Sequence, residues 1–212
     1  MADELWQRRA FLIPLFVGQT GVVMADAAAG IWASPVLERH YGLQPADFGG
    51  WLGGLVLLGG VIGAILGGFI ADWGQKSGRR GGLLFGALAC AAVGVPASLF
   101  PLMPSVFGFG AAIFTLLLVG TITGLITSVA LTVLLPNELR GLSIGAFIAV
   151  AGLIGFGIAP TLVTAVSSLL GGEVHLQVAL AGVGVAVSIV SVIGFHLAIR
   201  HAPLNPLEHP IG

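Results

Sequence analysis

Charged residues are what this sequence has least of. They make up 8% of its 212 residues, whereas 57% are hydrophobic. Soluble domains carry ~25% charged residues, so this chain cannot cover an apolar core with a water-soluble surface. Its apolar content is also far too high for a disordered chain. The net charge is -1 and no basic patch stands out, so we expect no nucleic-acid partner. The composition therefore predicts an all-α integral membrane protein.

Cysteine is almost absent as well. Cys90 is the single cysteine, which excludes a disulfide framework and a cysteine metal site. No residue spacing indicates a metal, a phosphate loop or a dinucleotide, so we expect no cofactor. Gly141-Leu-Ser143-Ile-Gly145 matches the nucleophile-elbow pattern of serine hydrolases, but that motif needs a strand before it and a helix after it. Here it would begin a membrane helix, so we interpret the match as chance and expect no catalytic residues.

Long uncharged runs separate small groups of charged residues. A transmembrane helix needs about 20 apolar residues, so the 57-residue run 81–137 predicts two crossings, with a turn at Pro101-Leu-Met-Pro104. These runs are too long and too uniformly apolar for the alternating strands of a β-barrel. The chain is therefore predicted to form a single bundle of six transmembrane helices over residues 1–212. We expect the helices at about 10–36, 48–71, 82–101, 106–134, 142–168 and 176–199.

Lysine and arginine are distributed unevenly between the two sets of helix ends. One set has only Arg39, and the other has seven basic residues: Arg8, Arg9, Lys76, Arg79, Arg80, Arg140 and Arg200. The positive-inside rule then predicts that both termini are cytoplasmic in a multi-pass protein of the cell (inner) membrane. The first span also fits a signal peptide cleaved near Ala25-Asp-Ala27. Its apolar stretch continues past that site, which favours a retained helix.

Asp26 is the one charged residue inside a predicted span. A carboxylate there costs roughly 2.5–3.5 kcal/mol on insertion scales, and such residues usually face the bundle interior and mark a substrate or proton path. Gln19 lies seven residues earlier on the same helix face. The alternative is an aspartate near the outer end of the helix that reaches water.

The fourth predicted span is polar on one side. At about 100° per residue, one half of this helix carries Gly120, Thr121, Thr123, Gly124, Thr127, Ser128 and Thr132. Serine and threonine can hydrogen-bond to the preceding turn, which accounts for one or two of the hydroxyls. The sorting of five hydroxyls onto one half favours a helix that lines a water-filled cavity.

Small residues recur at helical spacing in the second span. Gly59, Gly63 and Gly67 are four residues apart, a spacing that lets two membrane helices approach closely. In addition, Gly60-Val-Ile-Gly63 recurs in the fifth span as Gly152-Leu-Ile-Gly155. Six spans in which the second echoes the fifth predict a 3+3 inverted repeat, as found in many transporters.

The segment between the second and third spans carries a family resemblance. It runs from Gly67 through Asp72 to Arg79 and Arg80, and it resembles the cytoplasmic loop signature of the major facilitator superfamily: a glycine-containing helix turn, an aspartate at the helix end, then a basic cluster. Trp73 stands where the family has a basic residue. The resemblance implies a cytoplasmic gate in which the acid at the helix end holds one conformation shut. Its expected residues are Asp72, Lys76, Arg79, Arg80 and Arg140.

Three further segments resemble the Spinster-like bacterial branch of this superfamily. They are Trp32 to Leu43, Pro136 to Gly141 and Gly155 to Thr161. The resemblance covers residues 10–200 and corresponds to the C-terminal six-helix half of a twelve-helix transporter. It implies alternating access in which the first and fourth helices of each half line the cavity. The expected cavity residues are Gln19, Asp26, Trp32, Thr121, Thr127 and Ser128.

The resemblance also implies a function and its partners. Family members carry small organic or lipid-like solutes, often together with protons, so this chain is expected to be a secondary transporter or its C-terminal half, not an enzyme. A second six-helix half or a homodimer partner would complete it. Two alternatives come from other classes. One is an accessory membrane subunit without a transport path, and the other is an intramembrane hydrolase that uses Ser143 with His196.

Overall fold

The computed structural model describes residue 6 and residues 8–79, 81–135 and 137–202. These residues form long helices and two short 3-10 helices, and no β-strand occurs among them. Six segments are long and apolar enough to cross a membrane, the third being α4 together with η1. The predicted all-helical chain with six potential spans is therefore confirmed. The elements are α2 (Arg9–Tyr41), α3 (Pro45–Lys76), α4 (Gly82–Ala97), η1 (Phe100–Leu102), α5 (Val106–Leu134), α6 (Asn137–Leu169), η2 (Glu173–His175) and α7 (Leu176–His201).

Several helices extend beyond the predicted apolar runs. The first span was expected to end at residue 36, but α2 continues to Tyr41 and stops at Gly42, which adopts a left-handed conformation with φ 67°. The next helix begins with a capping box in which the Gln44 N–H donates to Asp47 Oδ2 at 2.9 Å. An apolar run measures only the part of a helix that suits hydrocarbon, whereas the helix itself ends where the backbone is capped.

The turn predicted within the long uncharged run is confirmed. α4 ends at Ala97, and η1 carries the chain around the Pro101–Pro104 segment. Ser105 then caps α5, because its Oγ accepts a hydrogen bond from the Gly108 N–H at 3.1 Å. The run 81–137 is thus divided into two antiparallel helices.

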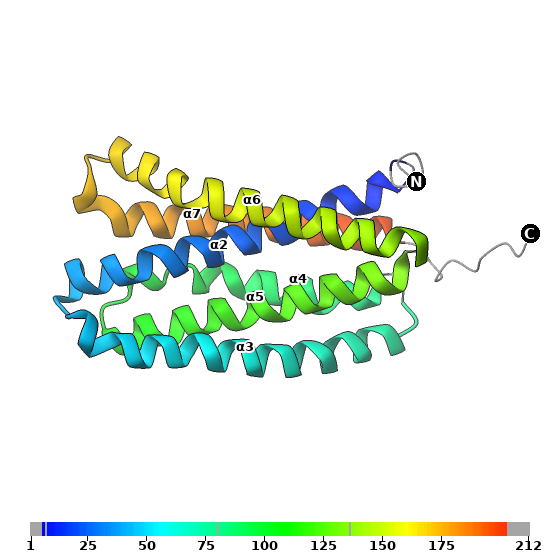
Figure 1. Cartoon of the computed structure of the whole chain (residues 1–212), viewed down its shortest axis with the longest axis horizontal. Coiled ribbons are helices and arrows are strands. Elements are labelled where there is room, and N and C mark those ends of the chain that lie inside the picture. The colour runs from blue at the N-terminus through cyan, green and yellow to red at the C-terminus, as the bar shows by residue number, and fades with distance from the viewer. Residues whose placement is uncertain (1–5, 7, 80, 136, 203–212) are drawn as a thin grey trace, which may run out of the picture.

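The helices pack in two layers. One layer is the row α6–α2–α5–α3, in which each helix contacts the next. The other consists of α7, packed mainly on α2, and α4, packed on α5, and these two helices also contact each other. Sequence neighbours are not always neighbours in space, since α2 and α3 scarcely touch, whereas α4 packs on α5. The outermost helices of the row, α3 and α6, lie at opposite edges of the bundle (Figure 1) and are the least buried of the six.

The closest helix crossing joins the first described span to the last. A Cβ added at Gly194 would lie 2.6 Å from the Gly18 Cα and 2.8 Å from the Pro14 carbonyl oxygen. A Cβ added at Gly21 would overlap Ser191 Oγ and would lie 2.6 Å from the Val187 carbonyl oxygen. At this crossing, α2 and α7 are therefore in backbone contact, which only glycine allows.

The two ends of the bundle differ in charge. The start of α2 and the end of α7 lie at the same end (Figure 1), together with the α3–α4 and α5–α6 connections. The described basic residues of the predicted cytoplasmic set are all at this end, here called the basic end, and Arg80 lies outside the described residues. Arg39 is at the opposite end, which we call the outer end after its predicted side of the membrane. The assignment of the basic end to the cytoplasm stays a prediction.

Candidate functional site

Asp26 and Gly120 meet halfway along the bundle. Asp26 is the eighteenth of the 33 residues of α2, and Gly120 is the fifteenth of the 29 residues of α5. The Asp26 carboxylate lies against Gly120, where an added Cβ would overlap Oδ2. Asp26 therefore lies near the middle of α2 and not near its outer end.

A second polar contact joins the same two helices. Thr127 Oγ1 donates a hydrogen bond to Gln19 Oε1 at 3.1 Å, and both residues are buried. The amide Nε2 of Gln19 lies over Gly124, 3.6 Å from where a Cβ would stand. We call Gln19 and Asp26 of α2, with Gly120, Gly124 and Thr127 of α5, the α2–α5 seam. It brings together three of the six expected cavity residues.

One carboxylate oxygen of Asp26 is left without a partner. Oδ1 is buried and makes no hydrogen bond to any described residue. Buried polar atoms are paired in the great majority of cases, so an unpartnered carboxylate oxygen is an unusual feature. The described residues contain no cluster of three His, Cys, Asp or Glu side chains that could hold a metal ion.

The other hydroxyls of α5 mostly bond to their own helix. Thr121, Thr123, Ser128 and Thr132 each donate to a carbonyl oxygen three or four residues earlier, at 2.8–3.0 Å. These four hydroxyls exceed the one or two that were expected to bond to their own helix. Thr121 also lies against Gly63 of α3, away from α2. A polar helix face can therefore be satisfied locally, and the aqueous cavity stays a prediction.

Trp32 is half-buried in α2, nearly two turns beyond Asp26 toward the outer end. It packs against the apolar cluster of the outer half of the bundle. Its indole Nε1 is buried and has no acceptor among the described residues. Trp32 and Asp26 thus supply an unpartnered donor and an unpartnered acceptor on one helix, and the place of Trp32 in a cavity stays a prediction.

The expected gate residues do not form ion pairs with one another in the described part of the chain. Asp72 is exposed near the end of α3. The Arg79 N–H donates to Ser77 Oγ at 3.4 Å, and Arg140 Nε donates to the Leu135 carbonyl oxygen at 3.1 Å, which links the end of α5 to the start of α6. Arg80 lies outside the described residues. The gate formed by Asp72, Lys76 and these arginines stays a prediction.

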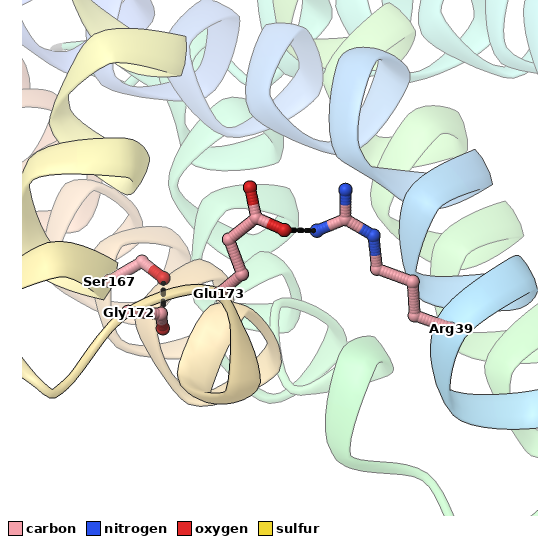
Figure 2. Close-up of polar contacts among 4 residues, drawn as sticks. All are labelled: Arg39, Ser167, Gly172 and Glu173. Carbon is pink, nitrogen blue, oxygen red and sulfur yellow. Dashed lines mark hydrogen bonds and ion pairs between the residues drawn. The ribbon is translucent and has the colours of Figure 1, made fainter.

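Sequence reasoning missed a polar group at the outer end. Arg39 of α2 forms an ion pair of 2.9 Å with Glu173 of η2, and Ser167 Oγ donates to the Gly172 carbonyl oxygen in the preceding turn (Figure 2). Both charged residues line a cavity of about 450 Å³. In the sequence, they are charges of opposite sign assigned to the same membrane surface, and this was the signal available.

The residues of the hydrolase alternative do not meet. Ser143 is buried within α6, and its Oγ has no hydrogen-bond partner among the described residues. His196 is exposed on α7. The Gly141–Gly145 motif lies inside a continuous helix, not between a strand and a helix. The geometry therefore gives this alternative no nucleophile–base pair.

Comparisons with known proteins do not assign a function to this chain. No protein-family model matches the chain, and no curated protein matches its sequence. The functional assignment therefore rests on the α2–α5 seam and on the way the six helices pack around it.

Proposed function

We propose that this chain is one six-helix half of a secondary transporter of the major facilitator type. It moves a small organic or lipid-like solute across the cell membrane by alternating access, together with protons. The observation that carries the proposal is the α2–α5 seam, where a carboxylate sits at mid-length between the first and fourth spans. An ionisable residue at this depth is a functional-site hypothesis by default, because its burial is costly.

The helix contacts support a 3+3 repeat. If α2, α3 and α4 are exchanged with α5, α6 and α7, the α2–α6 contact becomes the α5–α3 contact. The α2–α7 contact likewise becomes the α5–α4 contact. All four contacts are present, and the α2–α5 and α4–α7 contacts map onto themselves. Each triplet has an odd number of spans, so the two triplets run in opposite directions through the membrane.

The repeated glycine quartets occupy equivalent environments. Gly63 of α3 packs against Thr121 of α5, and Gly155 of α6 packs against Val23 of α2. The first glycine of each quartet, Gly60 or Gly152, faces open space. Equivalent positions in the two triplets thus contact the first helix of the other triplet, as an internal repeat requires.

One face of the helix row is left uncovered. α7 and α4 pack on one side of the row α6–α2–α5–α3, and no described helix packs on the other side. A second six-helix bundle, either a copy of this chain or a separate half, would cover that side and enclose the seam between the two bundles. This partner would complete the alternating-access path, and lipid would surround the remaining surface.

Thiol labelling tests whether water reaches the seam. The chain is produced in membranes with Cys90 replaced by alanine, and a single cysteine is placed either at Gly124 or at Ile189. Both positions are about 16 Å from the basic end by the 1.5 Å rise per residue, but Ile189 is exposed on the outside of α7. Thiols react as thiolates, which need water. We expect a water-soluble reagent to label Gly124→Cys at least tenfold faster than Ile189→Cys.

Equal labelling rates would contradict the proposed path and favour the accessory-subunit alternative. That alternative also predicts that Asp26→Ala leaves the biological activity of the complete assembly unchanged, whereas the transporter proposal predicts its loss. Folded protein is quantified in every variant by gel filtration in detergent, so that a loss of labelling is not confused with a loss of protein.

A further inference from the structure

A small internal cavity lies between the helix row and the layer of α4 and α7. Its volume is about 10 Å³, which is about the space that one water molecule needs. Residues of α2, α4, α5 and α7 line it, and all of the lining residues are buried. Most of the wall is apolar, but three hydroxyl groups face the cavity, those of Thr123 on α5 and of Ser188 and Ser191 on α7. The wall thus differs from that of an apolar cavity, which stays dry.

Two of these hydroxyls have already used their single proton. Thr123 Oγ1 donates to the Gly120 carbonyl oxygen at 2.8 Å, and Ser191 Oγ donates to the Val187 carbonyl oxygen at 3.0 Å. A hydroxyl oxygen also has two acceptor lone pairs. No described residue donates a hydrogen bond to either of these oxygens. Both hydroxyls therefore have unused acceptor capacity inside the bundle.

The third hydroxyl is in the same situation because of its neighbour at the end of α4. Ser188 Oγ lies 2.9 Å from Ser98 Oγ, and Ser98 Oγ also lies 2.8 Å from the Gly94 carbonyl oxygen. The carbonyl oxygen can only accept, so Ser98 gives its proton to Gly94, and Ser188 then donates to Ser98. Ser188 Oγ is left as an acceptor as well. The polar part of the cavity wall consists of three acceptors and lacks a donor.

Water meets this need better than a cation does. A water molecule has two O–H donors, and a buried water needs two to four polar partners, which the three hydroxyls supply. Hard cations such as Mg²⁺ and Ca²⁺ take six or more oxygen ligands, whereas three side-chain oxygens line this cavity. None of the lining residues is charged, so the charge of a cation would be uncompensated there.

We propose that this cavity is a binding site for one structural water molecule that links α5 to α7. The water donates one hydrogen bond to Thr123 and the other to Ser188 or Ser191. Such a water is costly to remove because it satisfies buried polar groups. Asp26 is not among the lining residues. The site therefore stands whether or not the chain transports a solute.

Solid-state NMR of the full chain in lipid bilayers tests this site by transfer of magnetisation from water to nearby carbon atoms. We expect transfer to the Cβ atoms of Thr123, Ser188 and Ser191 in the parent chain. Gly94→Ala should abolish it. The added Cβ would stand 3.8 Å from Val119 Cγ2 and 4.0 Å from Ser188 Oγ, which both line the cavity, so the methyl group takes the place of the water without a clash.

The variant retains all three hydroxyls, so it separates a bound water from exchange of the hydroxyl protons themselves. Gly182→Ala is the matched control, because its Cβ would face open space on α7, and it should retain the transfer. Transfer that persists in folded Gly94→Ala would come from the hydroxyl protons and would overturn the proposal. A parent chain without transfer at these carbons has a dry cavity and would overturn it too.

Two further measurements need no variant. A crystal structure that resolves ordered waters should show one peak in the cavity within hydrogen-bond distance of Thr123 Oγ1, and a cavity without a peak would contradict the proposal. NMR spectra recorded in sodium chloride and in choline chloride separate water from a cation. We expect the resonances of Thr123, Ser188 and Ser191 to be the same in both salts. A shift that depends on sodium would assign the site to a cation instead.

Discussion

The two sides of α3 use glycine in opposite ways. Gly59 and Gly63 face α5, and a Cβ at Gly63 would stand 2.8 Å from the Thr121 Cβ. Gly53, Gly60 and Gly68 face open space, although glycine costs a helix about 1 kcal/mol relative to alanine. Glycine thus serves a contact on one side of the helix and makes no contact within the described chain on the other. The open side is the kind of surface that the proposed second bundle would use.

The largest effect is expected where glycine allows backbone contact. A Cβ in Gly194→Ala would meet the backbone of α2 at Gly18, which cannot move aside as a side chain can. We expect a loss of about 2–3 kcal/mol in the free energy of unfolding, the upper range for overpacking. Gly182→Ala, at an open position of the same helix, is the matched control and should cost less than ~0.5 kcal/mol. Unfolding in mixed detergent micelles measures both. Similar losses in the two variants would mean that the α2–α7 crossing is looser than described.

The comparison within α3 is tested by two alanine substitutions three residues apart. Gly63→Ala would press on Thr121 and on the Leu118 carbonyl oxygen, which is 3.1 Å from the added Cβ, so we expect a loss of about 1–2 kcal/mol. Gly60→Ala meets nothing and should be neutral or stabilising in the isolated bundle. The same unfolding assay applies. A loss of assembly or activity in Gly60→Ala without a loss of stability would mark the open side as an interface. Equal destabilisation by both would erase the difference between the two sides.

The smallest effect is expected at the exposed ion pair of the outer end. The Arg39 and Glu173 side chains are 52% and 82% exposed, so their ion pair is well solvated. A double-mutant cycle of Arg39→Gln and Glu173→Gln should give a coupling energy of ~1 kcal/mol or less, and it should shrink further in high salt. A larger coupling energy that salt does not weaken would mean that the ion pair is shielded from water, unlike in the bundle described here.

Composition and uncharged runs were enough to predict the number of helices, because the bilayer sets a minimum length for an apolar span. They could not predict the helix ends. Gly42 and the capping box of Gln44 and Asp47 stop or start helices several residues outside the apolar runs. These caps depend on backbone conformation, which hydropathy does not record.

For the candidate site, the sequence could predict only which residues share one face of a helix. A face assignment places Asp26 and Gln19 on one side of α2, and the structure does bring both onto α5. It cannot say which neighbour a face meets, and so Thr121 was grouped with Thr127 although it packs on α3. The Arg39–Glu173 pair was missed because 134 residues separate its members, and only the packing of α7 beside α2 brings them together.

The intimate crossing of α2 with α7 has a consequence for how the chain is made. The groove around Gly18 and Gly21 can be filled only by the last described helix, so α2 must wait in the membrane until α7 has been synthesised and inserted. Contacts of such long sequence separation form late. During that interval, the glycine face of α2 lacks the helix that covers it in the finished bundle. Biogenesis, and not only the finished bundle, therefore sets how much change this face tolerates.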